Sequence, residues 1–274
     1  MSAPTATVGS SAVQARIEAC RAEGRAALVG YLPAGFPDVD TSIEALRAMV
    51  DAGVDVVEVG LPYSDPVMDG PTIQRAAETA LVGGMRTRDV FRVVEAVAAT
   101  GAPTLVMTYW NPVERWGVER FAADLAAAGG AGLITPDLIP DEAAEWLAAA
   151  DEHDLDRIFL VAPSSPTERI AFTVRACRGF VYATSVMGVT GARQATSVAA
   201  PALVERVRSE TDLPVGVGLG VSDGDQAAEV AAYADAVIVG SAFVRRLLDT
   251  ADREAGVAAI AELTVDLAAG VRRR

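Results

Sequence analysis

Short apolar segments alternate with longer amphipathic segments along almost the whole chain, and this alternation restricts the fold more than any other feature. Eight short segments rich in valine, isoleucine, leucine and alanine are bounded by glycine, proline or aspartate and predict strands. The predicted strands are 26–32, 54–59, 104–108, 132–135, 157–161, 180–184, 214–217 and 236–239. A helical pattern follows each of them, and no gap is long enough for a linker. The sequence therefore favours one parallel-stranded α/β domain.

Eight strand–helix units in about 250 residues match a single-domain (β/α)8 barrel, or TIM barrel. We expect an extra N-terminal helix over 11–23, which could close the bottom of the barrel. We also expect an inserted helix after the second strand, because helical segments over 72–82 and 87–99 are separated by Gly83 and Gly84. An open doubly wound sheet is the competing architecture, but no glycine fingerprint for a nucleotide follows the first strand.

The ends and the total charge of the chain limit its location and partners. Residues 1–10 lack the basic start and apolar core of a signal peptide, and we expect a flexible tail there before a barrel over 11–274. No run of 18 or more residues is apolar enough to predict a membrane span. A net charge of −14 would repel nucleic acid. We therefore expect a cytoplasmic enzyme that binds neither nucleic acid nor membrane.

Few side chains are available for metal binding or for histidine chemistry. Cys20 and Cys177 lie in predicted helices without metal-ligand spacing, which is typical of reduced core thiols. The single histidine, His153, lies in the polar run D-E-H-D-L-D and is interpreted as a surface residue. We expect no metal site, and acid–base chemistry is left to carboxylates by elimination.

The second predicted strand and the loop after it concentrate acidic residues. Glu58 lies among valines, so its charged form is disfavoured and its pKa should rise. A raised pKa suits a general acid or base that works near neutral pH. The loop adds Asp65 and Asp69. The alternative is structural: Glu58 pairs with an arginine, and both aspartates serve as turn and cap residues.

Glycines follow the last two predicted strands, which is where barrels of this type bind phosphate. Gly218 and Gly220 follow the seventh strand, and Gly240 and Ser241 follow the eighth and begin a helix. Glycine lets backbone amides approach an oxyanion, and a helix start adds partial positive charge. These glycines could also serve only tight turns. The glycine-flanked loop 185–193 is a candidate lid over the barrel mouth or an ordinary loop.

Residues 58–74, E-V-G-L-P-Y-S-D-P-V-M-D-G-P-T-I-Q, closely resemble the signature of the tryptophan synthase α subunit family. That family cleaves indole-3-glycerol phosphate to indole and glyceraldehyde 3-phosphate in L-tryptophan biosynthesis. The resemblance covers about residues 11–270 and implies a (β/α)8 lyase. It also implies a β-subunit partner, in an α2β2 complex, that holds pyridoxal phosphate and condenses the indole with serine. This chain shows no lysine site for that cofactor.

The resemblance assigns roles to individual residues. The position of Glu58 is that of the family's catalytic glutamate, which moves protons at the indole ring carbon and at the side-chain hydroxyl. The position of Asp69 is that of the aspartate that accepts or stabilises the indole N–H proton, and that of Asp65 communicates with the partner subunit. The segment S-V-M-G-V-T-G matches the family's closing loop, in which the residue matching Thr190 helps to place the catalytic aspartate.

Further positions match the family's substrate pocket. Tyr182 matches a tyrosine near the glutamate. Gly191, Leu219, Gly220, Gly240 and Ser241 match phosphate-binding positions, and Tyr31, Val106, Tyr109 and Thr135 match the indole pocket less closely. Met68, Trp110 and Met187 differ from the family's usual residues, which affects the shape of the pocket rather than the reaction.

Two alternatives to an α subunit remain open. The chain could be a stand-alone lyase that releases indole without a partner. It could also be a barrel that only binds or activates, although the presence of both Glu58 and Asp69 argues against this reading.

Overall fold

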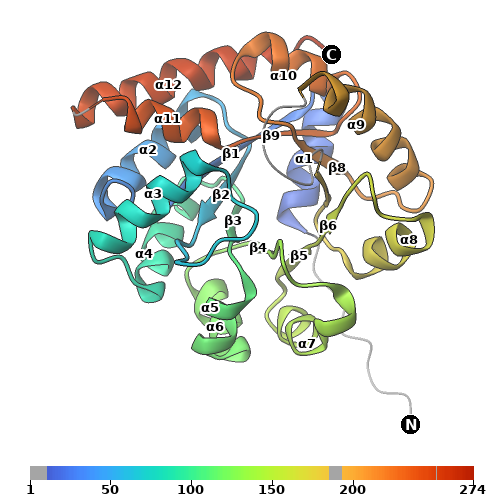
Figure 1. The fold of residues 1–274 in the computed structure, drawn as a ribbon, viewed down its shortest axis with the longest axis horizontal. Coiled ribbons are helices and arrows are strands. Elements are labelled where there is room, and N and C mark those ends of the chain that lie inside the picture. Colours follow the sequence, from blue (N-terminus) through green and yellow to red (C-terminus); the bar gives the residue numbers. More distant parts are fainter. Residues whose placement is uncertain (1–10, 185–192, 251) are drawn as a thin grey trace.

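The computed structural model describes residues 11–184, 193–250 and 252–274, and within them parallel strands form one barrel-shaped sheet surrounded by helices (Figure 1). The strands are β1 (Ala27–Pro33), β2 (Val56–Gly60), β3 (Thr104–Met107), β4 (Gly132–Ile134), β5 (Asp156–Ile158), β6 (Leu160–Val161), β7 (Val181–Thr184), β8 (Val215–Gly218) and β9 (Ala236–Val239). Their order is β5-β4-β3-β2-β1-β9-β8-β7-β6. The predicted (β/α)8 fold class is thereby confirmed, and the open sheet is not what the chain forms.

The fifth predicted strand differs from the prediction because it is divided at Phe159. Its first part, β5, pairs with β4, and its second part, β6, pairs with β7. On the other edge of β5, away from β4, the backbone of Arg157 forms an isolated antiparallel bridge with Arg178. Since the two ends of the sheet are consecutive pieces of one strand, the sheet closes into a barrel.

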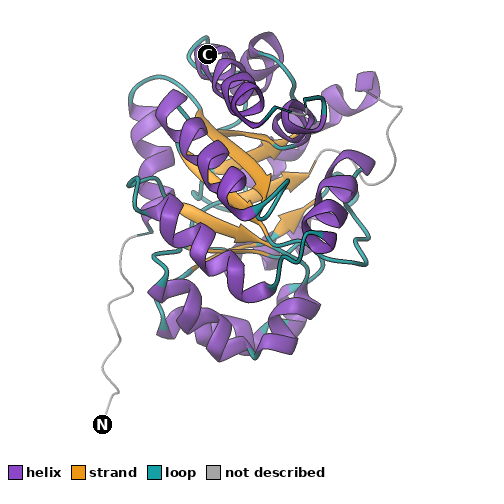
Figure 2. Cartoon of the chain, turned by 90° about the vertical axis from the view of Figure 1, so that its left-hand side faces the viewer, coloured by secondary structure: helices purple, strands orange, loops and turns teal. Residues whose placement is uncertain are grey.

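Helices cover the outside of the barrel in the side view (Figure 2). They are α1 (Ala12–Ala22), α2 (Val39–Ala52), α3 (Pro71–Val82), α4 (Thr87–Ala98), α5 (Trp110–Trp116), α6 (Val118–Ala127), α7 (Ala144–Glu152), α8 (Thr167–Ala176), α9 (Arg193–Arg208), α10 (Gly224–Ala231), α11 (Ser241–Leu248) and α12 (Arg253–Gly270), with a 3-10 turn at Pro140–Glu142. The predicted helix insertion after the second strand is confirmed as α3 and α4. The tail predicted for residues 1–10 lies outside the described residues.

One helix, α5, was not expected, because Asn111-Pro112 suggested a loop. A carboxylate oxygen of Asp137 accepts a hydrogen bond from the backbone N–H of Trp110 at 2.9 Å and satisfies one free donor of the first turn. Proline is tolerated in that turn because its missing N–H would have had no partner there. The cap comes from 27 residues away, so the local sequence does not show it.

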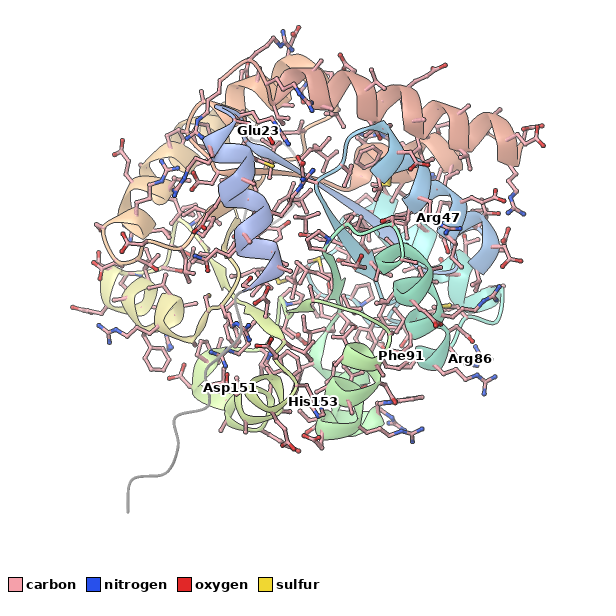
Figure 3. The ribbon with its side chains drawn as sticks, turned by 180° about the vertical axis from the view of Figure 1, so that it is seen from behind. Glu23, Arg47, Arg86, Phe91, Asp151 and His153 are labelled. Carbon is pink, nitrogen blue, oxygen red and sulfur yellow. The ribbon has the colours of Figure 1, made fainter. Side chains whose placement is uncertain are left out.

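The core has an inner and an outer shell. The outer shell lies between sheet and helices, whereas the inner shell fills the barrel with Val29, Val56, Leu105, Phe180 and other strand residues. Helix α1 crosses the N-terminal end of the barrel, as the view from behind shows (Figure 3), and its buried Val13, Ile17 and Cys20 belong to the inner shell. The prediction that an N-terminal helix closes the bottom is confirmed, and the site is left to the other end.

Candidate active site

Glu58 points into the barrel from the middle of β2. Side chains of a strand alternate between its two faces, and Val56 belongs to the inner shell, so Glu58 and Gly60 face inward too. The side chain of Glu58 is 1% exposed, and its Oε1 atom has no hydrogen-bond partner among the described residues. Burial raises its pKa from 4.5 to about 8. The expected pKa rise is confirmed, and no arginine side chain in the described part of the chain pairs with Glu58, as the structural alternative would require.

Two tyrosines lie beside this carboxyl. Tyr31 of β1 is the register partner of Glu58, and Tyr182 of β7 packs with the inner shell. Burial raises the pKa of each phenol well above 10.0, and the charge of Glu58 adds to both shifts. The structure therefore brings Glu58, Tyr31 and Tyr182 together in the barrel mouth.

Two glycines make room for these rings. A Cβ at Gly60 would come within 2.4 Å of the Tyr31 hydroxyl, and one at Gly218 within 2.7 Å of the Tyr182 hydroxyl. Neither ring can move away freely, because both are partly buried at the mouth of the barrel. Glycine is therefore required at both positions because a side chain would clash with a tyrosine, and not because of the backbone conformation.

Asp69 lies in the loop after β2, partly buried, and Tyr109 holds that loop in place. The Tyr109 hydroxyl accepts hydrogen bonds from the backbone N–H groups of Met68 at 2.9 Å and Asp69 at 3.2 Å. Burial raises the pKa of Asp69, and a hydrogen bond from Tyr109 opposes the rise. The charge of Asp69 also contributes to the raised pKa of Tyr31, so this carboxyl faces the same mouth as Glu58. Sequence reasoning named Tyr109 only as pocket lining and missed its bonds to the loop.

Asp65 lies apart from these groups. Its side chain is exposed and accepts a hydrogen bond from the hydroxyl of its neighbour Ser64 at 2.5 Å. Val67 and Met68 in the same loop are 79% and 45% exposed. The outer half of the loop is thus an exposed apolar surface, whereas its last residue, Asp69, turns inward.

The candidate phosphate loops lie at the ends of β8 and β9. Gly220 has a φ of +67°, a left-handed conformation that glycine adopts without strain. Gly240 is the N-cap residue of α11, and Ser241 is the first residue of that helix. A Cβ at Gly240 would lie 3.1 Å from the Tyr31 ring, so this helix start borders the same mouth as the carboxylates.

Some predicted site residues cannot be placed, and others lie elsewhere. Thr190, Gly191 and Met187, with the candidate lid, lie outside the described residues. Val106 packs in the outer shell and does not face the barrel interior. The hydroxyls of Thr108 and Thr135, just after β3 and β4, are buried without a partner in the described part of the chain.

The described residues were compared with what a metal site and a membrane-spanning helix require. Among the described residues, no group of three or more histidine, cysteine or acidic side chains is placed to hold a metal ion. His153 contacts Glu119, with 2.6 Å between Nε2 and Oε1, on the surface shown in Figure 3. No helix in the described ranges has the length and apolarity needed to cross a bilayer.

Known proteins resemble this chain over nearly its whole length. The family model for the tryptophan synthase alpha chain matches residues 17–272. The tryptophan synthase alpha chain of Acidothermus cellulolyticus is 67% identical over 263 residues, which cover 96% of this chain and 98% of that protein. That of Salinispora tropica is 65% identical over 262 residues, covering 96% and 98%.

Solved structures agree with the sequence comparisons. A structure of Mycobacterium tuberculosis tryptophan synthase contains a chain that superimposes with a TM-score of 0.90 at 60% identity, covering 96% of this chain and 99% of that one. The tryptophan synthase alpha subunit of Legionella pneumophila has a TM-score of 0.85 at 30% identity, covering 94% and 97%. The chain belongs to the tryptophan synthase alpha chain family.

Proposed function

We propose that this chain cleaves indole-3-glycerol phosphate to indole and glyceraldehyde 3-phosphate, as the α subunit of tryptophan synthase, with Glu58 and Asp69 as its catalytic residues. Family membership supports the carbon–carbon lyase reaction and its place in tryptophan biosynthesis. The single observation that carries the residue assignment is Glu58. It is a buried carboxyl with a pKa of about 8 and no hydrogen-bond partner for Oε1, in the mouth of a barrel.

The environment of Glu58 fits two proton transfers. The neutral carboxyl donates its proton to the indole ring carbon that carries the glycerol side chain, and the ring becomes a positively charged indolenine. The resulting carboxylate then removes the proton of the adjacent side-chain hydroxyl. As the carbon–carbon bond breaks, its electron pair returns to the ring and the hydroxyl carbon becomes the aldehyde. Glu58 ends in its starting protonation state, so no other proton donor is needed at this carbon.

Asp69 and the phosphate loops complete the proposed site. Protonation of the ring makes the indole N–H more acidic, and a carboxylate at Asp69 stabilises or accepts that proton. Leu219 and Gly220, after β8, and Gly240 and Ser241, at the start of α11, would bind the phosphate through backbone amides. Tyr31, Tyr109 and Tyr182 would border the indole ring. Thr190 and Gly191, outside the described residues, remain part of the proposal on the resemblance alone.

The proposal includes a β subunit as partner, with pyridoxal phosphate bound there. All 23 basic residues of this chain are arginines, so it has no lysine for a Schiff base with that cofactor. The matching M. tuberculosis structures are described as tryptophan synthase. An α2β2 assembly and a cytoplasmic location remain predictions.

The partner surface would consist of the loop 61–69 and residues 109–113, which were expected as a loop and form the start of α5. The first exposes Val67 and Met68, and apolar side chains exposed side by side are typical of protein interfaces. A hollow of about 310 Å³ lies between the two segments, lined by Pro62, Tyr63 and Asn111 among others. Asp65, exposed on the first segment, is placed to communicate with the partner, as the resemblance implies.

Indole release from indole-3-glycerol phosphate tests the proposed function. The purified chain should release indole slowly, and an added tryptophan synthase β subunit should raise the rate strongly and co-elute with the chain. The assay compares initial rates with and without the β subunit. Fast release that does not respond to the partner would favour the stand-alone lyase. No release under either condition would rule out the proposed reaction.

The pH dependence of the reaction should follow the carboxyl of Glu58. The first step needs its neutral form, so kcat/KM of indole release should be level at lower pH and fall as pH rises above about 8. The measurement is kcat/KM for wild-type protein, and the residual activity of Glu58→Gln should lack this decline. A rise of kcat/KM through the same pH range would mean that Glu58 begins the reaction as a base.

A further inference from the structure

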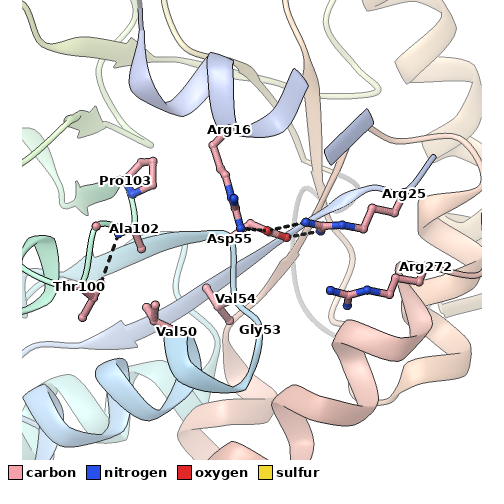
Figure 4. Close-up of a pocket in the computed structure, with 11 residues that line it drawn as sticks. Arg16, Arg25, Val50, Gly53, Val54, Asp55, Thr100, Ala102, Pro103 and Arg272 are labelled. Atoms are coloured by element: carbon pink, nitrogen blue, oxygen red, sulfur yellow. Dashed lines mark hydrogen bonds and ion pairs between the residues drawn. The ribbon is translucent and has the colours of Figure 1, made fainter. Parts of the chain in front are cut away.

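A second cavity lies at the N-terminal end of the barrel, opposite the site proposed above. Its volume is about 300 Å³, and it opens where the chain enters β1, β2 and β3. Asp55, at its centre, precedes the first residue of β2 (Figure 4). The lining residues are Arg16, Arg25, Val50, Gly53, Val54, Asp55, Thr100, Gly101, Ala102, Pro103 and Arg272.

Both carboxylate oxygens of Asp55 already accept two hydrogen bonds each from groups of the protein. One oxygen accepts from Arg25 Nη2 at 2.9 Å and from Arg16 Nη2 at 2.7 Å. The other accepts from Arg25 Nη1 at 2.6 Å and from the backbone N–H of Leu28 at 2.9 Å. Burial would raise the pKa of Asp55, but the hydrogen bonds from Arg25 and Leu28 hold it below 3.8. Asp55 is therefore a carboxylate that Arg25 and Arg16 share, and Arg25 also pairs with the exposed Glu23 at 2.7 Å.

Among the pairs formed in the described part of the chain, Arg16, Arg25 and Arg272 face two carboxylates, Asp55 and Glu23, so the cluster keeps an excess of one positive charge. Arg16 and Arg272 also have N–H groups to spare. Each uses one terminal nitrogen within the described part of the chain: Arg16 Nη2 donates to Asp55, and Arg272 Nη1 donates to the carbonyl of Ala268 at 2.5 Å. Both side chains line the cavity, where the guanidinium groups of Arg16 and Arg25 meet at Asp55 and that of Arg272 lies nearby (Figure 4). An excess of positive charge in a protein of net charge −14 calls for an anion.

Several apolar side chains line the rest of the cavity, together with Thr100. Val50, Val54, Ala102 and Pro103 lie across from the arginines. Backbone donors on this side are used within the chain, since Gly53 bonds to Val50 and Gly101 to Ala98. A cavity lined by both cations and hydrocarbon fits a molecule with an anionic group and a small apolar body.

We propose that this cavity is a binding site for a small organic oxyanion, whose phosphate or carboxylate group takes the spare N–H groups of Arg16 and Arg272 while its body packs on Val50, Val54 and Pro103. Planar guanidinium groups bind such oxyanions through paired hydrogen bonds. The site joins α1, the start of β2 and the end of α12, so an occupant would hold three distant segments together.

The test is direct binding with defined probes: phenyl phosphate, benzoate and inorganic phosphate, measured by isothermal titration calorimetry at low salt. Phenyl phosphate and benzoate separate phosphate from carboxylate recognition, and inorganic phosphate lacks the apolar body. We expect saturable binding with a Kd below about 1 mM for at least one organic probe, tighter than for inorganic phosphate. The same probe should raise the melting temperature, because it binds only the folded chain.

Two substitutions locate the binding. The double variant R16Q/R272Q should bind the probe at least about tenfold more weakly, because charge-assisted hydrogen bonds are lost. It should still fold, since Asp55 keeps Arg25 and Leu28 as partners. The control R273Q, which changes an arginine on the same tail that pairs with Asp225 at 2.8 Å, should bind normally. Equal binding by R16Q/R272Q, which would place the probe at the barrel mouth, or no saturable binding below about 10 mM, would overturn the proposal.

Discussion

Replacing Glu58 by glutamine should lower kcat for indole release by about 10²–10⁴-fold, which is the usual contribution of a general acid or base. Glutamine has nearly the same shape but can neither donate a proton to the ring carbon nor remove one from the hydroxyl. Substrate affinity should be retained, because the phosphate loops and the tyrosines are unchanged. The measurement is single-turnover indole release together with substrate binding at equilibrium.

Stability measurements separate this loss from unfolding. The folded carboxyl has a pKa of about 8 against 4.5 without burial, so between these values the unfolded chain releases a proton that the folded chain keeps. The free energy of unfolding of the wild-type protein therefore decreases as pH rises through this range. Glu58→Gln has no ionisable group at this position and does not show this decrease. The free energy of unfolding of Glu58→Gln should therefore increase relative to that of the wild-type protein over the same pH range. Glu78→Gln, the same change on the exposed face of α3, should leave kcat unchanged. Near-normal turnover by Glu58→Gln would refute the assigned role.

Replacing Asp55 by alanine should destabilise the fold by about 3–5 kcal/mol, the usual cost of removing one partner of a buried ion pair. Asp55 is 2% exposed and Arg25 6% exposed, so the variant leaves a buried guanidinium without its buried counter-charge and with only the exposed Glu23 as a partner. Since a domain of ordinary stability has about 5–15 kcal/mol, this is a large share of the total. The measurement is the free energy of unfolding from urea titration.

Three comparisons test whether the loss of the buried ion pair causes the destabilisation of Asp55→Ala. Asp225→Ala, which removes a side chain that is 87% exposed and pairs with Arg273, should cost less than about 1 kcal/mol. The double variant D55A/R25M should recover part of the loss, because the unpaired charge is gone. The pKa of Asp55 is lowered in the folded state, so its contribution is present above pH 3.8 and is lost as pH falls below it. A loss of the same size at all pH values would mean that packing, rather than charge, is responsible.

The general fold could be predicted because each strand–helix unit shows its own local pattern. Valines on both sides of Glu58 also predicted its burial and its raised pKa, and the structure confirms both. These inferences need only neighbours along the chain. The resemblance added residue roles that no local pattern contains, and for the positions around Thr190 it remains their only support.

Features that depend on distant residues were not predictable. Asp137 caps α5 from 27 positions away, and the Tyr109 hydroxyl holds a loop 40 residues earlier. The fifth strand is divided at Phe159 because its first part pairs with β4 and its second with β7, and Arg157 also bonds to the distant Arg178. For the second predicted strand, 54–59, an arginine partner of a buried acid was considered at Glu58, whereas the structure has one at Asp55. Both residues lie among valines, and only the assembled barrel places Arg25 beside Asp55.

The closure of the barrel by the two ends of the chain has a consequence during protein synthesis. Ser11, at the start of α1, donates a hydrogen bond to Asp156 at 2.6 Å, and the backbone N–H of Ala26 donates to the carbonyl of Val271 at 3.2 Å. Strand β1 pairs with β9, so its second edge stays open until that strand has been made. A nascent chain on the ribosome therefore exposes the open edge of β1 until β9 has emerged. During that interval it is a natural client for chaperones that shield apolar strand edges.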